Sequence, residues 1–328
     1  MAAPSYHDLL ALRLAGKKVV FNFRGTEARA PSIFKELSPY HYVAENPNRI
    51  FDKWTDRRIL KSIELIKTVA NKVLVTDPEI QSYVNGGEIV PRSIDTNLWR
   101  PARRAKQTKP RPLIIHAPSK RAIKGTASVL NCIAFLKAEG YDFDFKLVEG
   151  LSNNSAKELY TEADIVIDQL RIGWYGVLAV ECMALGKTVL AYIRDDLIDT
   201  LGETPPLVPT TPTSLAADLR QLLNNKEQIS VIGHLAREFT LKVHDSEIVN
   251  KAYIQHYDDA MRDSSVPDAG VILDFFNSQA DEALSVNSAL LKKIKRVTRY
   301  QATWRFLIVQ ILKKMKILHP IKRFLERG

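Results

Sequence analysis

Short apolar runs alternate with helical patterns along most of the chain. Seven runs, several rich in β-branched residues, predict strands at residues 18–23, 72–76, 88–90, 113–117, 143–148, 163–168 and 188–193. Helical patterns predict helices at residues 125–138, 155–161, 177–185, 214–224, 226–242 and 245–262. Strands that alternate with helices of this length indicate βαβ units and parallel sheets, and runs such as DIVID suit strands covered on both faces. The pattern therefore predicts an α/β fold.

The segment at residues 91–112 divides this pattern into two parts. It contains four prolines and no sustained periodicity, which predicts a linker between two parallel sheets. A second linker is expected at residues 263–270. We therefore expect an N-terminal domain at residues 1–102, a C-terminal domain at 103–262, and a linker with a basic helical tail at 263–328.

The composition permits two ordinary domains and indicates a compartment. Hydrophobic residues make up 45% of the 328 residues, enough to fill two cores. Both cysteines, Cys132 and Cys182, lie in apolar stretches, which fits a reducing compartment. The first apolar run, residues 9–14, is short and interrupted by Arg13, so we expect no signal peptide and a cytoplasmic protein.

The net charge of +10 is concentrated near the C-terminus. Residues 288–328 hold twelve Lys and Arg against one acid, so they carry +11 and the rest of the chain carries −1. A nearly neutral body does not favour nucleic acid as a partner, whereas a basic tail favours an anionic membrane surface.

Residues 303–318 predict a basic amphipathic helix in this tail. Its apolar stripe consists of Trp304, Leu307, Ile308, Ile311, Leu312, Met315 and Leu318. The stripe either enters a membrane interface or packs against the body or a second copy. We expect the membrane, at its inner face, because cations beside an apolar face gain about 1 kcal/mol each from anionic lipid.

A cluster of cations follows the strand predicted at residues 113–117. Lys120, Arg121 and Lys124 precede Gly125 and a helix. Positive side chains near a helix N-terminus form an anion site, because the backbone N–H groups and the helix dipole both face the ligand. Open α/β sheets also bind ligands at the carboxyl ends of their strands. The segment is a candidate phosphate site, with solvated loop charges as the alternative.

A second candidate site follows the strand predicted at residues 163–168. Gly173 and Gly176 flank Trp174 and Tyr175, so the backbone can approach a ligand while the rings offer a platform. Glu181 lies in the apolar helix that follows, and a carboxylate there must be paired or bound. Its partner is either a neighbouring Lys or Arg or a ligand, and the sequence favours neither.

These segments together resemble the retaining glycosyltransferases of the GT-B fold, which has two Rossmann-like domains. ECMALGKTV resembles the family's E-A-M-A-x-G-x-P-V signature, and ADIVID resembles its A-D-[VI]-x-[VL]. KGTASVL is similar to its K-G helix start, and RSIDTNLWRP to its interdomain G-V-D-T-x-x-F-x-P. The four motifs agree in order and spacing over residues 70–262. The resemblance implies a family 4-like hexosyltransferase that uses a nucleotide sugar and needs neither a metal nor another cofactor.

The resemblance also implies roles for individual residues. Lys124 would neutralise the leaving diphosphate, which is commonly the largest contribution to catalysis, and Glu181 would bind the ribose hydroxyls. Gly150 would let the base lie against the sheet edge. The implied donor-binding set is Ser119, Lys120, Arg121, Gly125, Gly150, Gly173, Trp174, Tyr175 and Gly176.

Two positions depart from the family pattern. The family has a glutamate eight residues before Glu181, where it contacts the donor sugar, and this chain has Gly173. The family's arginine five residues before the lysine corresponds to Ser119, so Lys120 or Arg121 would replace it. A subgroup with H-A-P-S, K-G-T and D-Q-x-x-x-G-W-Y-G at these places closely resembles this chain, which indicates a subgroup variant.

The N-terminal part matches less of the family's acceptor domain. VVFNFRGTEAR is similar to a strand and loop from the middle of that domain, and only one strand precedes the helix-rich stretch to Lys72. We therefore expect this domain to be incomplete: either the chain is a truncated product or a partner subunit supplies the rest. Arg24, beside Gly25, is the expected cleft contact and third catalytic residue, with a plain surface residue as an equal alternative.

The sequence thus predicts transfer of a sugar from a nucleotide-sugar donor to a glycan or lipid-linked acceptor in cell-surface polysaccharide synthesis. The alternative is a non-catalytic nucleotide-sugar or glycan-binding subunit tethered by the tail. Gly173 and the incomplete domain favour the alternative, whereas Lys124 and Glu181 favour the enzyme. Among the histidines, none has metal-ligand spacing, and His116 is expected to be a satisfied core residue.

Overall fold

The computed structural model describes residues 6–42, 53–101, 111–198, 200, 202–267 and 270. The chain divides into two compact units, residues 1–267 and 268–328, and nearly all described residues belong to the first. Its elements are α1 (His7–Leu14), β1 (Val20–Phe23), α2 (Pro31–Leu37), α3 (Lys53–Val69), β2 (Lys72–Val75), α4 (Pro78–Gln81), β3 (Glu88–Ile89), β4 (Leu113–His116), α5 (Arg121–Lys124), α6 (Thr126–Ala138), β5 (Asp144–Leu147), α7 (Asn153–Glu162), β6 (Ile165–Ile167), α8 (Val177–Ala184), β7 (Thr188–Ala191), η2 (Asp195–Leu197), β8 (Val208–Pro209), α9 (Leu215–Asn224), α10 (Lys226–Val243) and α11 (Ser246–Arg262).

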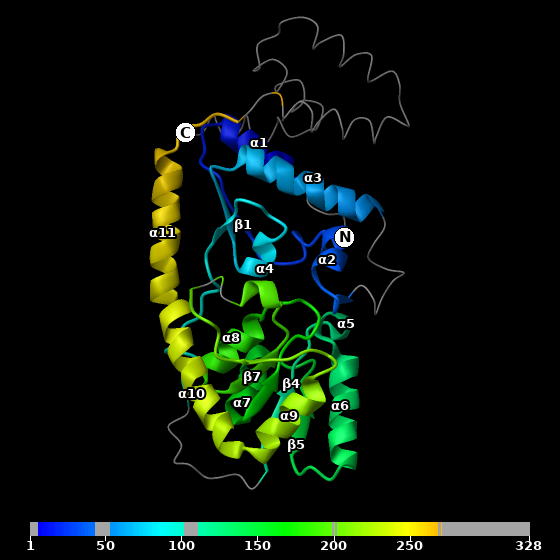
Figure 1. Cartoon of the computed structure of the whole chain (residues 1–328). Helices are drawn as coiled ribbons and strands as arrows, with labels where there is room; N and C mark the ends of the chain where they lie inside the picture. The colour runs from blue at the N-terminus through cyan, green and yellow to red at the C-terminus, as the bar shows by residue number, and fades with distance from the viewer. Residues whose placement is uncertain are drawn as a thin grey trace, which may run out of the picture. The chain divides into compact units, whose positions relative to one another are not determined.

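Two parallel sheets organise this unit, as the alternation of strands and helices predicts. The first has the order β1-β2-β3 and, with α1 to α4, forms the N-terminal lobe (Figure 1). The second has the order β5-β4-β6-β7-β8 and, with α5 to α10, forms the C-terminal lobe. All seven predicted strands are present, each shorter than predicted. The two-residue β8 was not predicted, because so short a strand leaves no periodic pattern.

The C-terminal sheet is covered by helices on both faces. Ile165 and Ile167 of β6 join a core with α6 and α9, whereas Val166 joins a core with α8 and α10. Successive strand residues point to opposite faces, so an apolar run such as IVI needs both cores. The order of this sheet reverses at β4, whose two neighbours are β5 and β6.

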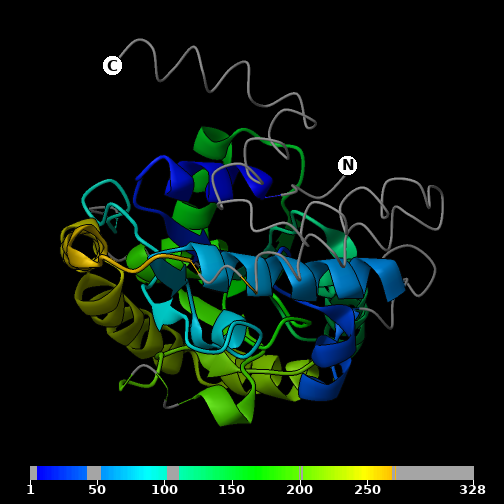
Figure 2. The same cartoon turned by 90° about the horizontal axis from the view of Figure 1, so that it is seen from above.

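The N-terminal lobe has a core of its own. Ile63 and Ile66 of α3 pack with Phe23 of β1 and Val75 of β2. Figure 2, a view from above, shows α3 running along this lobe. Ile172, from the loop after β6, joins the same core, so a C-terminal-lobe loop is anchored in the N-terminal lobe.

The predicted linker is an ordered strap where the structure describes it, up to residue 101. Ile94 forms a parallel bridge with Asp245, and Arg237 of α10 donates hydrogen bonds to the carbonyls of Thr96 and Trp99. Its pairing depends on these partners from the other end of the chain, which explains why the segment shows no period of its own.

The helix α11 returns from the C-terminal lobe to the N-terminal lobe. Val249 packs against Leu74 and Val90, and Tyr253 accepts a hydrogen bond from Asn22 at 2.5 Å. The lobes are therefore joined twice, by the strap and by α11.

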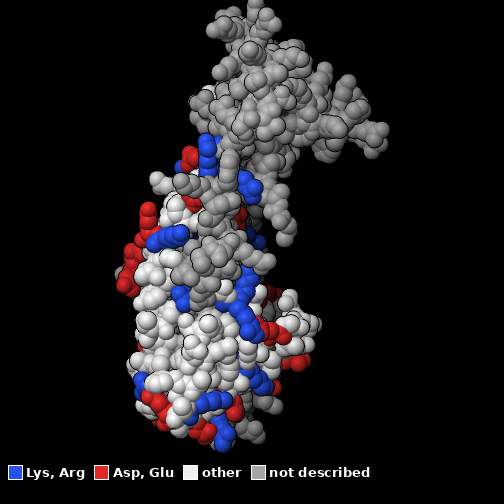
Figure 3. All heavy atoms as spheres, turned by 90° about the vertical axis from the view of Figure 1, so that its right-hand side faces the viewer, with Lys and Arg blue, Asp and Glu red and all other residues white. Residues whose placement is uncertain are grey.

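Basic and acidic side chains are intermingled on the face of the body seen in Figure 3, as a nearly neutral body predicts. No helix of the described residues is long and apolar enough to cross a membrane. The same residues contain no group of His, Cys, Asp and Glu that could hold a metal ion. The predicted tail helix and residues 102–110 lie outside the described residues.

Candidate functional site

The candidate site lies where the strand order of the C-terminal sheet reverses. The loop of residues 117–120 with α5 follows β4, and the loop of residues 168–176 follows β6. Both loops leave the carboxyl edge of neighbouring strands, and ligands of open α/β sheets bind at this reversal. The two segments chosen from the sequence are thus adjacent.

Lys124 is buried and paired within the protein. Its Nζ lies 2.6 Å from Oδ1 of Asp168 and 3.0 Å from Oε1 of Gln169. Oδ2 of the fully buried Asp168 accepts the N–H of Gly176 at 2.7 Å, at the start of α8. A buried carboxylate persists when an opposite charge and hydrogen bonds replace its water. The carboxylate of Asp168 therefore binds Lys124 and the N-terminus of α8, where an anion of the ligand was expected to bind.

Gly176 allows this close approach. A Cβ atom there would lie 3.1 Å from Oδ2 of Asp168, 3.1 Å from Nζ of Lys124 and 3.2 Å from Oε1 of Gln169. Only glycine leaves this cluster undisturbed. Gly125, predicted in the donor-binding set, has a φ of 73° and ends α5 directly after Lys124.

Glu181 lies in α8, close to the same cluster. Burial, followed by the charge of Asp168, raises the pKa of its carboxyl group to about 7, and the charge of Lys124 opposes the shift. No hydrogen bond or ion pair joins this carboxyl group to another residue that the structure describes. Glu181 is therefore close enough to Lys124 for their charges to interact, as the resemblance implied, and it remains available as an acceptor.

The aromatic platform expected at Trp174 and Tyr175 is not exposed. The residues are 2% and 1% exposed, and their rings stack at 4.9 Å within the core of the C-terminal lobe. The Tyr175 hydroxyl donates to Nε2 of His244 at 2.9 Å, while Nδ1 of His244 donates to the Arg92 carbonyl. Burial lowers the pKa of His244 to about 4, so the ring is neutral. These rings therefore pack in the core and support the loop of residues 173–176, which we call the glycine loop, instead of facing a ligand.

The other predicted donor-binding residues before α5 and at its start lie at the surface. Ser119, Lys120 and Arg121 are exposed. Arg121 pairs with Glu149 at 2.5 Å, so it is already partnered in this loop cluster. Beside Glu149, Gly150 has a φ of 68° and nothing within 4 Å of a Cβ position, which leaves the open space expected there.

His116 is the satisfied core residue that the sequence predicted. Burial lowers the pKa of this imidazole. Its Nδ1 donates to the Ile167 carbonyl at 2.8 Å, and its Nε2 accepts from the Thr126 hydroxyl at 2.9 Å. The ring ties β4 to β6 and α6 beneath the site.

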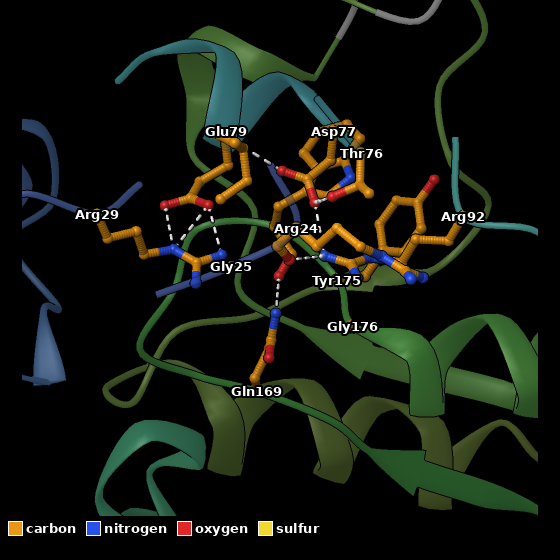
Figure 4. A network of polar contacts seen from close by, with 12 residues as sticks. Arg24, Gly25, Arg29, Thr76, Asp77, Glu79, Arg92, Gln169, Tyr175 and Gly176 are labelled. Carbon is orange, nitrogen blue, oxygen red and sulfur yellow. Dashed lines mark hydrogen bonds and ion pairs between the residues drawn. The ribbon is translucent and has the colours of Figure 1, made fainter. Parts of the chain in front are cut away.

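A polar network lies on the N-terminal-lobe side (Figure 4). Arg29 and Glu79 form a buried pair at 2.7 Å, and Arg92 bonds to Asp77 at 2.7 Å. The predicted cleft residue Arg24 is exposed, and its carbonyl accepts from Arg92 at 3.4 Å. Its guanidinium makes no hydrogen bond or ion pair with a described residue, so the structure leaves it outside the Lys124 cluster.

Direct contacts between the lobes lie beside the glycine loop. The Tyr192 ring, after β7, packs edge-on against Tyr40 at 5.1 Å and its hydroxyl lies 3.4 Å from that of Ser38. Tyr40 also lies 3.2 Å from Thr213 through their hydroxyls. The N-terminal lobe thus contacts Tyr192, whose ring is a neighbour of Gly173.

Gly173 has a close neighbour that the sequence did not indicate. Its φ is 94°, and a Cβ there would lie 2.7 Å from Cγ and 2.8 Å from Cδ of Arg194. Asp168, Gln169 and Arg194 are the site residues that sequence reasoning did not select. Asp168 and Gln169 directly follow the strand that ends at Ile167, and this position was the sequence signal that could have identified them.

Comparisons with known proteins agree at the level of the fold. No protein-family model and no curated protein matches the sequence. A glycosyltransferase from Rickettsia africae aligns with a TM-score of 0.55 and 15% identity over 80% of this chain and 76% of its own. Sucrose-phosphate synthase from Thermosynechococcus elongatus aligns with a TM-score of 0.57 and 15% identity over 76% and 70% of the two chains. Alr3699/HepE from Anabaena, in complex with UDP and glucose, aligns with a TM-score of 0.55 and 16% identity over 76% of this chain and 74% of its own. The chain has the GT-B fold, with Rossmann-like domains.

Proposed function

We propose that the chain binds a nucleoside diphosphate sugar beside Lys124 and Glu181 and transfers its sugar to an acceptor. The observation that carries the proposal is the Glu181 carboxyl group, which is half-buried, unbonded to any described residue and near a buried lysine. Such a group is costly to keep without a partner, and perturbed acids in ligand-binding clefts are typical of functional sites. Support also comes from Anabaena Alr3699/HepE, which shares the fold and was crystallised with UDP and glucose.

Glu181 would accept hydrogen bonds from the ribose hydroxyls. A carboxylate accepts through both oxygens, and the pKa of about 7 allows it to be ionised near neutral pH. The open backbone at Gly150 would accommodate the base.

Lys124 would act together with the neighbouring exposed cation Lys120. Because Asp168 cancels the charge of Lys124, the pair alone offers a diphosphate little net attraction. As negative charge develops on the leaving phosphate, Lys124 can share its three N–H donors between Asp168 and that oxygen. The retained configuration, the hexosyl group, the absence of a metal requirement, and a glycan or lipid-linked acceptor at the inner membrane face are finer parts of the same proposal. The basic tail would supply the membrane contact, and a partner subunit the rest of the acceptor wall.

Calorimetry with UDP, GDP and ADP tests the proposal. At least one nucleotide should bind, and Glu181→Gln should weaken that binding tenfold or more, about 1.4 kcal/mol. The matched control is Glu158→Gln, an exposed glutamate of α7, which should leave the affinity unchanged. A folded protein that binds none of the three nucleotides would contradict the proposal.

A non-catalytic binding subunit is the second candidate. The covered Gly173 favours it, because no side chain at this position can contact a sugar. Release of labelled sugar from the bound donor, to water or to an added glycan acceptor, separates the two candidates. Binding without any release would support the binding subunit.

A further inference from the structure

Arg194 is a buried cation at the carboxyl edge of the C-terminal sheet. It follows β7 and is 4% exposed. Its backbone N–H donates to the Gly173 carbonyl at 3.0 Å, which fixes it to the loop that ends at Gly176. The residue therefore lies on the same edge as the Lys124 cluster.

The guanidinium group of Arg194 is only partly satisfied. Its Nε and Nη2 donate to the Asp196 carboxylate at 3.0 and 2.5 Å. Its Nη1 is buried and has no hydrogen-bond partner among the residues that the structure describes. Asp196 is itself 62% exposed, so water weakens its ion pair with Arg194. A buried guanidinium N–H without an acceptor is costly and calls for a ligand.

Arg194 differs from the other buried cations of the two lobes in having no buried carboxylate within the described part of the chain. Lys124 is paired with the buried Asp168, and Arg29 with the buried Glu79. An anion would give Arg194 the acceptor that its Nη1 lacks. Gly173 provides the room for the Arg194 side chain, because a Cβ at 173 would clash with its Cγ and Cδ. The buried position of Arg194 therefore requires glycine at position 173.

We propose that Arg194 binds an anionic group of the nucleotide sugar at the loop of residues 173–176. The proposal rests on the proposed function and names the part of the ligand that this loop recognises. A guanidinium fork suits a phosphate or a carboxylate, since both offer paired oxygens. The anion is thus either the diphosphate or the carboxylate of an acidic sugar.

Calorimetry on the full chain distinguishes these sources. The probes are UDP, GDP and ADP, then the glucose and glucuronate conjugates of whichever diphosphate binds. The variants are Arg194→Met, which keeps most of the side-chain volume, and Arg194→Lys, which keeps the charge without the fork. Arg220→Gln is the matched control, because Arg220 lies on α9 and pairs with Glu139 at the end of α6. Melting curves confirm that each variant is folded.

We expect Arg194→Met to weaken binding at least tenfold, Arg194→Lys to weaken it less, and Arg220→Gln to have no effect. Equal losses for the free diphosphate and both conjugates identify the diphosphate as the anion. A loss confined to the glucuronate conjugate, which wild type then prefers over glucose, identifies the carboxylate. Unchanged affinities in both Arg194 variants would overturn the inference while leaving the proposed function intact. If wild type binds no nucleotide, it is the proposed function that fails.

Discussion

Replacing Lys124 with methionine tests whether this lysine neutralises the buried Asp168. The substitution keeps an unbranched side chain of similar length but removes the charge 2.6 Å from Oδ1 of Asp168. Gly176 would then be the remaining hydrogen-bond partner of a carboxylate with no exposed surface. Removing one partner of a buried ion pair typically costs about 3–5 kcal/mol.

Lys124→Met should therefore lower the free energy of unfolding by about 3–5 kcal/mol at pH 7. Urea unfolding at pH 7, followed by far-UV circular dichroism, measures this penalty.

Lys120→Met is the matched control, because Lys120 is an exposed cation four residues away in the same segment, and it should cost under about 0.5 kcal/mol. A penalty below about 1 kcal/mol at pH 7 would refute the role assigned to Lys124.

Three further predictions concern other parts of the molecule. Because burial raises the pKa of Glu181 to about 7, wild type should lose stability relative to Glu181→Gln as pH rises from about 4.5 through 7; parallel melting temperatures from pH 5 to 8.5 would contradict this. Gly173→Ala should lower the free energy of unfolding by at least about 2 kcal/mol, because it combines a positive φ with a clash. Gly150→Ala should lower it by only about 1 kcal/mol, because only the positive φ is unfavourable there. Equal losses for the two variants in urea unfolding would refute this reasoning. The full chain should sediment with anionic vesicles in a salt-sensitive way and a chain ending at Asp263 should not; equal binding would place the contact on the body.

Much of the fold could be predicted because the central strands of the C-terminal sheet, β4, β6 and β7, are buried on both faces. Such strands are mostly or wholly apolar, as Ile165–Ile167 is, and this requirement is visible in the sequence without knowledge of their neighbours. The placement of Lys124 and Glu181 in one site was implied by the family resemblance and not by local pattern.

The partners of these residues could not be predicted from local pattern. Whether Asp168 faces Lys124 or solvent depends on how two loops fold against each other. The aromatic pair at 174–175 suits a ligand platform and a core equally well, and its partner His244 lies 69 residues further along. Arg194 is buried only because Gly173, in a different loop, leaves room for it.

The bridge between Ile94 and Asp245 has a mechanical consequence. Both covalent connections between the lobes pass through this point, since Ile94 belongs to the strap and Asp245 stands at the start of α11. Two crossings fastened together act as a pivot: the lobes can turn about it while the bridge survives, but sliding apart would break it. The pivot includes His244, whose ring holds the Tyr175 hydroxyl behind the glycine loop. A rotation of the lobes would therefore reach the loop of residues 173–176 by two routes, through the His244 imidazole at the pivot and through Ile172, which is packed in the N-terminal core.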